Sequence, residues 1–270
     1  MPSASFAGAS VDTVPSSEVG ERRRNLSLRI LSAAALAPPV LLLAWLGGLW
    51  FGIAVALTMA AALREWLRAV SGRPLVAGYF ALLAAILAYW RFGAPVAVAW
   101  LLVFSFALGI LARSGHRPNP WFAALGLPYV GFAMIALPWV RDSFADGWHL
   151  VLFVFLIVWA SDIGAFAAGR AIGGPKLAPA VSPNKTWSGL VGGVVSAGLV
   201  AFGWAEALAI EAPAYAIIVA IGLSLVGQGG DLFESSVKRR VRLKDSGGLI
   251  TGHGRLLCRV DGLLRVAPVF

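Results

Sequence analysis

The residues most able to do chemistry gather near the C-terminus. The stretch from Ser235 to Asp261 contains seven of the chain's 22 Lys and Arg residues, and Asp231 lies just before it. Mg²⁺ prefers a few carboxylates together with the phosphate oxygens of a substrate, and nucleotidyl transfer needs little more than a metal ion, cations and alignment. Carboxylates at both ends of a basic band therefore predict a metal and nucleotide site, with Asp231 and Asp261 as metal ligands.

The alternative for this basic band is a patch that binds lipid headgroups, because basic runs beside a membrane usually do so. Such a patch needs neither flanking carboxylates nor the glycine loop "DSGGLITGHG" that carries His253. The loop does not match the Walker A form, so a P-loop ATPase is not expected. We expect His253 to orient the loop or to contact a phosphate rather than to act as a lone general base.

A second polar cluster, "SDIGAFAAGR", begins at Ser161 after a nearly unbroken apolar run. Placing Asp162 there has a free-energy cost, because a carboxylate within or beside a membrane span destabilises the protein by several kcal/mol unless it is paired or solvated. Two readings are open. Asp162 either forms a salt bridge with Arg170 at the end of the same cluster, or it lines a polar site.

A third cluster, "KLAPAVSPNKTWSG", runs from Lys176 to Gly189. Its prolines favour a stiff, extended path between two apolar segments. Ser182, Lys185 and Thr186 offer a cation and two hydroxyls, which are groups that bind phosphate. The alternative is an ordinary basic loop.

Composition determines where these clusters can lie. Hydrophobic residues make up 59% of the sequence and the mean hydropathy is +0.81, which is typical of a membrane protein. The net charge of +9 therefore predicts contact with anionic membrane lipids and not with nucleic acid. The single cysteine, Cys258, excludes an internal disulfide.

Apolar segments long enough to span a bilayer alternate with polar connections. The run from Leu31 to Leu63 is too long for one span, and we expect it to turn at Gly47–Gly48. Because open strands cannot satisfy their backbone groups in lipid, the sequence predicts an all-α, polytopic integral membrane protein with about eight transmembrane helices. The expected spans are 31–47, 49–63, 75–90, 94–112, 121–140, 149–168, 189–205 and 213–229.

The basic residues predict the orientation of these spans. If the N-terminus is cytoplasmic, 20 of the 22 Lys and Arg residues lie on the cytoplasmic side, and only Arg91 and Arg141 lie outside. Residues 1–27 are polar and Ser-rich, which predicts a disordered cytoplasmic leader rather than a cleaved signal peptide. We expect N-terminal transmembrane helices over 28–148 and a C-terminal transmembrane catalytic region over 149–270 with cytoplasmic motif loops.

Together these motifs resemble the phosphatidate cytidylyltransferase family, also called CDP-diacylglycerol synthases. The two upstream clusters and "GDLFES" are similar to three ordered elements of that family, and the likeness extends in detail from about residue 159 to the C-terminus. The C-terminal signature of the family is matched at Ser235, Lys238, Arg239, Lys244, Asp245, Gly247, Ile250, His253, Gly254, Arg259 and Asp261.

The resemblance implies that CTP and phosphatidate are converted to CDP-diacylglycerol and pyrophosphate, with Mg²⁺ as cofactor, in the inner membrane of a bacterium. It also allows a homodimer. It implies catalytic roles for Asp231, Lys238, Arg239, Lys244, Asp245, His253 and Asp261. It implies substrate binding by Asp162, Arg170, Ser182, Lys185, Thr186, Ser235 and Arg259.

The sequence departs from the family pattern at several positions. Cys258 stands where the family has a metal-binding Asp, and a thiol is a poor partner for Mg²⁺. Arg255 replaces a Gly, Thr251 a Pro and Ser188 a Glu, and the family continues beyond Phe270 into another hydrophobic segment. One alternative is thus a weakened or inactive homologue. A transporter or lipid-binding protein is less favoured, because the polar clusters all lie at the cytoplasmic surface of the second half rather than at the midplane of both halves.

Overall fold

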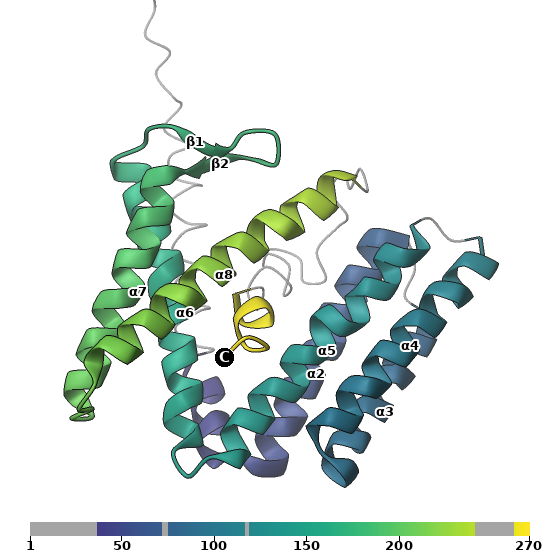
Figure 1. Ribbon diagram of the computed structural model, residues 1–270. Coiled ribbons are helices and arrows are strands. Elements are labelled where there is room, and N and C mark those ends of the chain that lie inside the picture. Colours follow the sequence, from purple (N-terminus) through teal and green to yellow (C-terminus); the bar gives the residue numbers. More distant parts are fainter. Residues whose placement is uncertain (1–36, 72–74, 117–118, 241–261) are drawn as a thin grey trace, which may run out of the picture. The chain divides into compact units, whose positions relative to one another are not determined.

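The apolar segments fold into helices, in which every backbone amide can be paired inside the segment. The computed structural model describes residues 37–71, 75–116, 119–240 and 262–270. Within these ranges, helices follow one another along the chain, and a two-stranded antiparallel hairpin lies between two of them (Figure 1). The elements are α2 (Gly48–Ser71), α3 (Val76–Phe92), α4 (Ala94–Ser114), α5 (Pro120–Ser143), α6 (Gly147–Ala171), β1 (Lys176–Ala178), β2 (Ser182–Thr186), α7 (Trp187–Ala207) and α8 (Pro213–Arg240).

Six of the described helices are long and apolar enough to cross a membrane, namely α2, α4, α5, α6, α7 and residues Pro213–Val237 of α8. The helix α3 and a preceding helix, Ala37–Leu46, are shorter. Each expected span coincides with one of these helices, the first of them from residue 37 onward. The chain is therefore an all-α, multi-pass membrane protein, as predicted, and the number of eight spans stays a prediction.

Large apolar side chains on the surface of the helices fit a lipid surrounding. Leu57 of α2, Phe80 of α3 and Leu199 of α7 are 68%, 67% and 66% exposed. Such surfaces would be costly in water. In a bilayer they face hydrocarbon chains, so the exposed apolar residues support the membrane assignment.

The chain turns at Gly47 and Gly48, as the sequence predicted. Their φ angles are +65° and +52°, in the left-handed region that glycine enters without a steric penalty. A side chain at Gly47 would also meet the guanidinium of Arg141, whose Cζ lies 2.7 Å from the position of the missing Cβ. The backbone conformation therefore favours glycine at position 47, and a side chain there would displace the Arg141 guanidinium.

Two charged residues at the end of α5 hold this turn. Arg141 donates through Nε to the carbonyl oxygen of Ala44 at 2.5 Å and through Nη2 to that of Trp45 at 2.6 Å. The next residue, Asp142, accepts a hydrogen bond from the backbone N–H of Gly48 at 3.1 Å. We call Arg141 and Asp142 the turn clasp, because these hydrogen bonds join them to backbone groups of the turn.

The helices α6 and α7 pack closely because small residues line their contact. A Cβ added to Gly192 of α7 would lie 2.2 Å from the Cβ of Ala168 and 2.8 Å from the carbonyl oxygen of Gly164, both on α6. Small residues allow membrane helices to approach in this way. The glycine-rich start of α7 thus has a packing role, and the approach brings the ends of these two helices together.

The last described residues, 262–270, pack into the core of α6, α7 and α8. Residues 262–266 are helical, and Figure 1 shows this segment beside α8. The ring of Phe270 lies 6.2 Å from that of Phe153 on α6. The buried cluster that includes this segment consists of Phe153, Val154, Ile157, Val158, Ala197, Ala201, Ala220, Leu223 and Val266.

Candidate functional site

The helix α8 carries a carboxylate to the edge of the membrane. With 28 residues it is about 42 Å long, whereas the hydrocarbon core of a bilayer is about 30 Å thick. Asp231 lies roughly 27 Å from the start of the helix at Pro213. If α8 enters the hydrocarbon core at Pro213, Asp231 therefore lies near the opposite boundary of that core. Its side chain is 41% exposed.

The hairpin positions Lys185 at the same end of the molecule. In its register Lys176 pairs with Thr186 and Ala178 with Ser182, and α7 begins directly after β2. Thr186 caps α7, because its Oγ1 accepts a hydrogen bond from the backbone N–H of Gly189 at 3.1 Å. The hairpin is therefore fixed at the start of α7.

Asp231 lies between two cations. Lys185 Nζ forms an ion pair with Asp231 Oδ2, and Arg265 Nη1 lies 3.5 Å from Asp231 Oδ1. Lys185 also donates to the carbonyl oxygen of Gln228 at 3.4 Å, and Arg265 donates to that of Gly227 at 2.8 Å. We call Lys185, Asp231 and Arg265 the Asp231 triad. It joins three segments that are far apart in sequence: the hairpin, α8 and the C-terminal residues.

Exposure differs among the three members of the triad. The side chain of Arg265 is only 9% exposed, that of Lys185 is 24% exposed, and that of Asp231 is 41% exposed. One cation is thus largely covered against α8, while the other cation and the carboxylate are reachable from outside. The reachable pair is the part of the triad that a ligand can meet.

A second contact joins the hairpin to α8. Arg239, near the end of α8, donates through Nε to the carbonyl oxygen of Val181. Val181 precedes Ser182, the first residue of β2. This contact and the Lys185–Asp231 ion pair place the hairpin motif and the α8 motif at one end of the molecule, as we expected for a common site.

Buried hydroxyls and an amide link the helices beneath the triad. Ser161 of α6 and Ser224 of α8 are hydrogen-bonded through their Oγ atoms at 2.7 Å. Gln228, one turn after Ser224, donates through Nε2 to Ser224 Oγ and to the carbonyl oxygen of Leu190, each at 3.3 Å. Buried polar groups of this kind favour one arrangement of helices. The network therefore fixes α8 relative to α6 and α7.

Other predicted site residues lie around this arrangement. Asp162 is exposed on α6, and its Oδ2 would be 3.7 Å from a Cβ at Gly262, so it lies beside the start of the C-terminal segment. Arg170 is exposed at the end of α6, and Ser235 is half-buried one turn beyond Asp231. Lys244, Asp245, His253, Arg259, Asp261 and the side chain of Lys238 lie outside the described residues, as do the departures Thr251, Arg255 and Cys258.

Thr186 differs from the expectation of a phosphate-binding hydroxyl. It is 5% exposed, and its hydroxyl both caps α7 and lies 2.9 Å from Ser188 Oγ. These contacts assign it a role in holding the hairpin. Ser188 in turn donates to the carbonyl oxygen of Gly173 at 2.5 Å. Substrate contact by Thr186 stays a prediction, and its buried position does not favour it.

Arg265 is the site residue that sequence reasoning missed. It lies in the apolar sequence "GLLRVAPVF" at residues 262–270. A charged residue within a membrane-embedded apolar segment is a functional candidate by itself, and this signal was available. Its partner, Asp231, could not be predicted from the sequence, because no local sequence pattern shows that this segment lies along α8.

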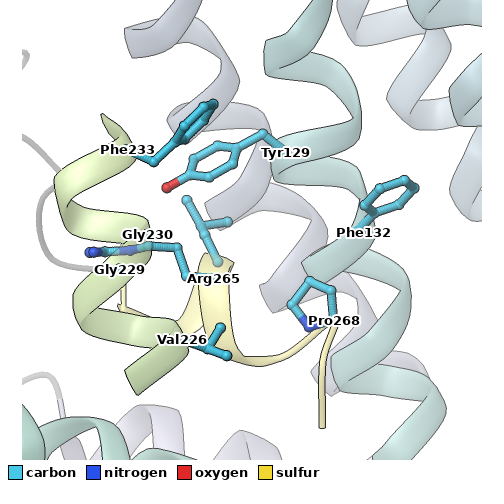
Figure 2. Close-up of a pocket in the computed structure, with 9 residues that line it drawn as sticks. Tyr129, Phe132, Val226, Gly229, Gly230, Phe233, Arg265 and Pro268 are labelled. Atoms are coloured by element: carbon cyan, nitrogen blue, oxygen red, sulfur yellow. The ribbon is translucent and has the colours of Figure 1, made fainter. Parts of the chain in front are cut away.

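A pocket of about 380 Å³ lies beside the triad, between α5, α8 and the C-terminal segment (Figure 2). Figure 2 shows the Tyr129 hydroxyl directed toward α8 and the Arg265 side chain crossing α8 next to Gly229 and Gly230. The other lining side chains are apolar. The lining residues are Tyr129, Phe132, Val226, Gly229, Gly230, Phe233, Leu264, Arg265 and Pro268.

The described residues suit a metal ion only in part. Within the described ranges, no three His, Cys, Asp or Glu side chains come together. Asp231 supplies hard carboxylate oxygens at an accessible position. Mg²⁺ commonly keeps several waters and binds through one or two carboxylates plus substrate phosphates, so one carboxylate beside cations fits an ion that is shared with a phosphate ligand.

Comparison with known proteins agrees with this arrangement. The model of the cytidylyltransferase family matches residues 27–270. A phosphatidate cytidylyltransferase of Brucella suis is 39% identical over 255 residues, which cover 91% of this chain and 92% of that protein. Phosphatidate cytidylyltransferases of Rickettsia bellii and Staphylococcus saprophyticus are 36% and 38% identical, over 64% and 63% of this chain and 81% and 66% of their own lengths. The chain thus belongs to the cytidylyltransferase family.

Proposed function

We propose that this protein transfers the cytidylyl group of CTP to phosphatidate, giving CDP-diacylglycerol and pyrophosphate. The relative from Brucella suis, which matches over 92% of its length, is named for this reaction. The observation that carries the proposal is the Asp231 triad, in which the hairpin and α8 motifs meet. A water-soluble triphosphate and a lipid phosphate can both reach such a position.

The triad supplies fixed positive charge for this transfer. An oxygen of the phosphatidate phosphate attacks the α-phosphorus of CTP, the bond from that phosphorus to the bridging oxygen of the β-phosphate breaks, and pyrophosphate leaves. Lys185 binds and orients a phosphate oxygen, because its ammonium group is partly exposed and needs no proton transfer to act. Preorganised cations of this kind stabilise the charge that moves toward the leaving group.

Mg²⁺ is the expected cofactor. Asp231 would hold it, together with Asp261 by the family pattern, and the bound ion would neutralise charge on the phosphates. Asp231 fits this role, since its carboxylate is half-exposed next to Lys185, the accessible cation that would face the same phosphates. The roles of Lys238, Arg239, Lys244, Asp245, His253 and Arg259 stay predictions.

The proposed location is the inner membrane of a bacterium, with the N-terminus and the triad on the cytoplasmic side, where CTP is made. With the eight spans that the sequence predicts, the excess of Lys and Arg on one side of the membrane supports this orientation. The contacts of Lys185 and Val181 in the hairpin region with α8 support a common side of the membrane for these motifs. Binding of surrounding membrane lipids follows from the exposed apolar helices, and a homodimer stays a prediction.

Purified protein tests the proposal directly. We expect labelled CTP, phosphatidate and Mg²⁺ in mixed micelles to give CDP-diacylglycerol, and no product when phosphatidate is replaced by diacylglycerol, which lacks the attacking phosphate. Absence of product with the complete mixture contradicts the proposal.

The variant Cys258→Asp tests the alternative of a weakened homologue. It restores the carboxylate that the family has at this position, so we expect product formation to rise by about tenfold, the change that corresponds to 1.4 kcal/mol of added stabilisation. The measurement is the initial rate at saturating CTP beside the unaltered protein. A lower rate for Cys258→Asp would show that position 258 has another role.

A further inference from the structure

The buried cation of the triad has a defined setting that Lys185 lacks. The stem of Arg265 crosses α8 at Gly230, where an added Cβ would lie 2.1 Å from Arg265 Cδ and 2.6 Å from Cγ. A side chain at position 230 would therefore displace Arg265. At the far end of the stem, Nη1 is held by the carbonyl oxygen of Gly227 at 2.8 Å.

This setting fixes the guanidinium beside Asp231. Gly227 lies one helical turn before Asp231 on α8, so the same nitrogen reaches the Gly227 carbonyl and lies 3.5 Å from Asp231 Oδ1. The side chain of Arg265 is 9% exposed. Lys185, which comes from the hairpin and is more exposed, engages the other carboxylate oxygen. Arg265 is thus the fixed partner of Asp231, and Lys185 is the accessible one.

The charges of the triad affect how a divalent cation reaches Asp231. Two cations and one carboxylate leave a net positive charge, which opposes the approach of a free divalent ion. A complex of such an ion with a nucleotide triphosphate remains anionic and is attracted. Both carboxylate oxygens already face protein cations, so the ion gains little from Asp231 unless phosphates are also present.

We propose that Arg265 is a positioning residue that keeps Asp231 paired with protein cations, so that a divalent cation occupies this carboxylate only together with the nucleotide triphosphate. The inference rests on the proposed function, because CTP is the triphosphate that the site would take. It gives a distinct reason for an arginine inside the apolar C-terminal segment.

The alternative role for Arg265 is to pin the C-terminal segment to α8. Loss of that role would lower the stability of the protein without changing its affinity for a metal ion in the absence of nucleotide. Binding of Mn²⁺, measured by electron paramagnetic resonance on metal-free protein in detergent, separates the two roles because it requires no turnover.

We expect wild-type protein to bind Mn²⁺ at least about tenfold more weakly without CTP than with it, since like charges oppose the free ion. Arg265→Leu should bind Mn²⁺ without CTP about tenfold more tightly than wild type, whereas Arg265→Lys, which keeps the charge, should stay close to wild type. The matched control is Arg141→Leu, which removes an arginine from the turn clasp and should leave Mn²⁺ binding unchanged.

Gly230→Ala is the second variant, because it displaces the arginine without removing it. It should also raise Mn²⁺ affinity in the absence of CTP, and it serves alone if Arg265→Leu does not fold. The inference is overturned if wild type binds Mn²⁺ equally well with and without CTP, or if the folded variants of these two positions bind it no more tightly than wild type. A wild-type protein that shows the expected Mn²⁺ binding but makes no CDP-diacylglycerol would contradict the proposed function instead.

Discussion

The turn clasp and the Asp231 triad both place an arginine and an aspartate beside apolar helices, but with different partners. In the clasp, Arg141 and Asp142 bind backbone carbonyls and an N–H of the Gly47 turn. In the triad, Asp231 faces two side-chain cations, and one of them, Lys185, is partly exposed. The clasp holds two helices together, whereas the triad holds charges next to one another.

This difference indicates which charged residues can exchange partners. The clasp side chains pair with backbone groups of the turn, so these charges contribute to the fold. A lysine paired with a half-exposed carboxylate can bind a phosphate instead at modest cost, because ion pairs near solvent contribute little to stability. The charges of the clasp therefore hold backbone groups, whereas those of Lys185 and Asp231 in the triad are accessible and are the ones that we propose bind ligands.

The test with the largest expected effect replaces one aspartate by asparagine in each region. Asp231→Asn removes the negative charge that would hold the metal ion, and we expect the rate of CDP-diacylglycerol formation to fall about 10²- to 10³-fold, the usual cost of losing a preorganised electrostatic group. Asp142→Asn keeps an oxygen that can accept from Gly48 and should leave the rate nearly unchanged. Initial rates in mixed micelles measure both.

Thermal unfolding of the same two variants is the control. Both should remain folded at the assay temperature, because asparagine has nearly the same size as aspartate. Equal losses of rate for Asp231→Asn and Asp142→Asn would remove the distinction between the two regions.

The second test removes one cation from each region. Lys185→Met keeps the length of the side chain but not its charge, and we expect the rate to fall about 10- to 100-fold as the phosphate-binding ammonium is lost. Arg141→Met removes two charged hydrogen bonds to the turn and should lower the free energy of unfolding by about 2 kcal/mol. The rate per folded molecule should stay near that of wild type.

Each measurement should therefore change mainly in one of the two variants. Initial rate reports the loss at position 185, and the midpoint of thermal unfolding reports the loss at position 141. A destabilised but fully active Lys185→Met protein would place Lys185 with the structural group.

Several of these features could be predicted from sequence, because they depend on local pattern. The break at Gly47 follows from an apolar run too long for one span, and the meeting of Lys185 with the α8 motif follows from placing two polar clusters on one side of the membrane. The contact itself is confirmed by the Lys185–Asp231 ion pair. The residues' chemical roles remain predictions.

Other features depend on tertiary contacts that no local pattern contains. Arg265 reaches Asp231 because an apolar segment packs along α8 and crosses it at Gly230. Likewise, the Ser161–Ser224 hydrogen bond joins positions 63 residues apart within two apolar spans. The capping role of Thr186 has a local signal, because a threonine directly before a helix is a familiar N-cap; substrate contact by its hydroxyl stays a prediction.

The smallest expected effect is at Thr186, which lies between the polar groups that hold the fold and those that we propose bind ligands. Thr186 follows Lys185 in the chain, yet its hydroxyl is engaged by the Gly189 N–H at 3.1 Å and the residue is 5% exposed. Thr186→Ala should therefore cost about 1 kcal/mol of unfolding free energy, the usual value of a lost N-cap, with Thr186→Ser restoring most of it. The rate per folded molecule should fall less than about threefold, because no transition-state contact is removed. If Thr186→Ala instead lowered the rate more than about tenfold with no change in unfolding, the hydroxyl would contact substrate and the ligand-binding region would extend from the triad into the start of α7.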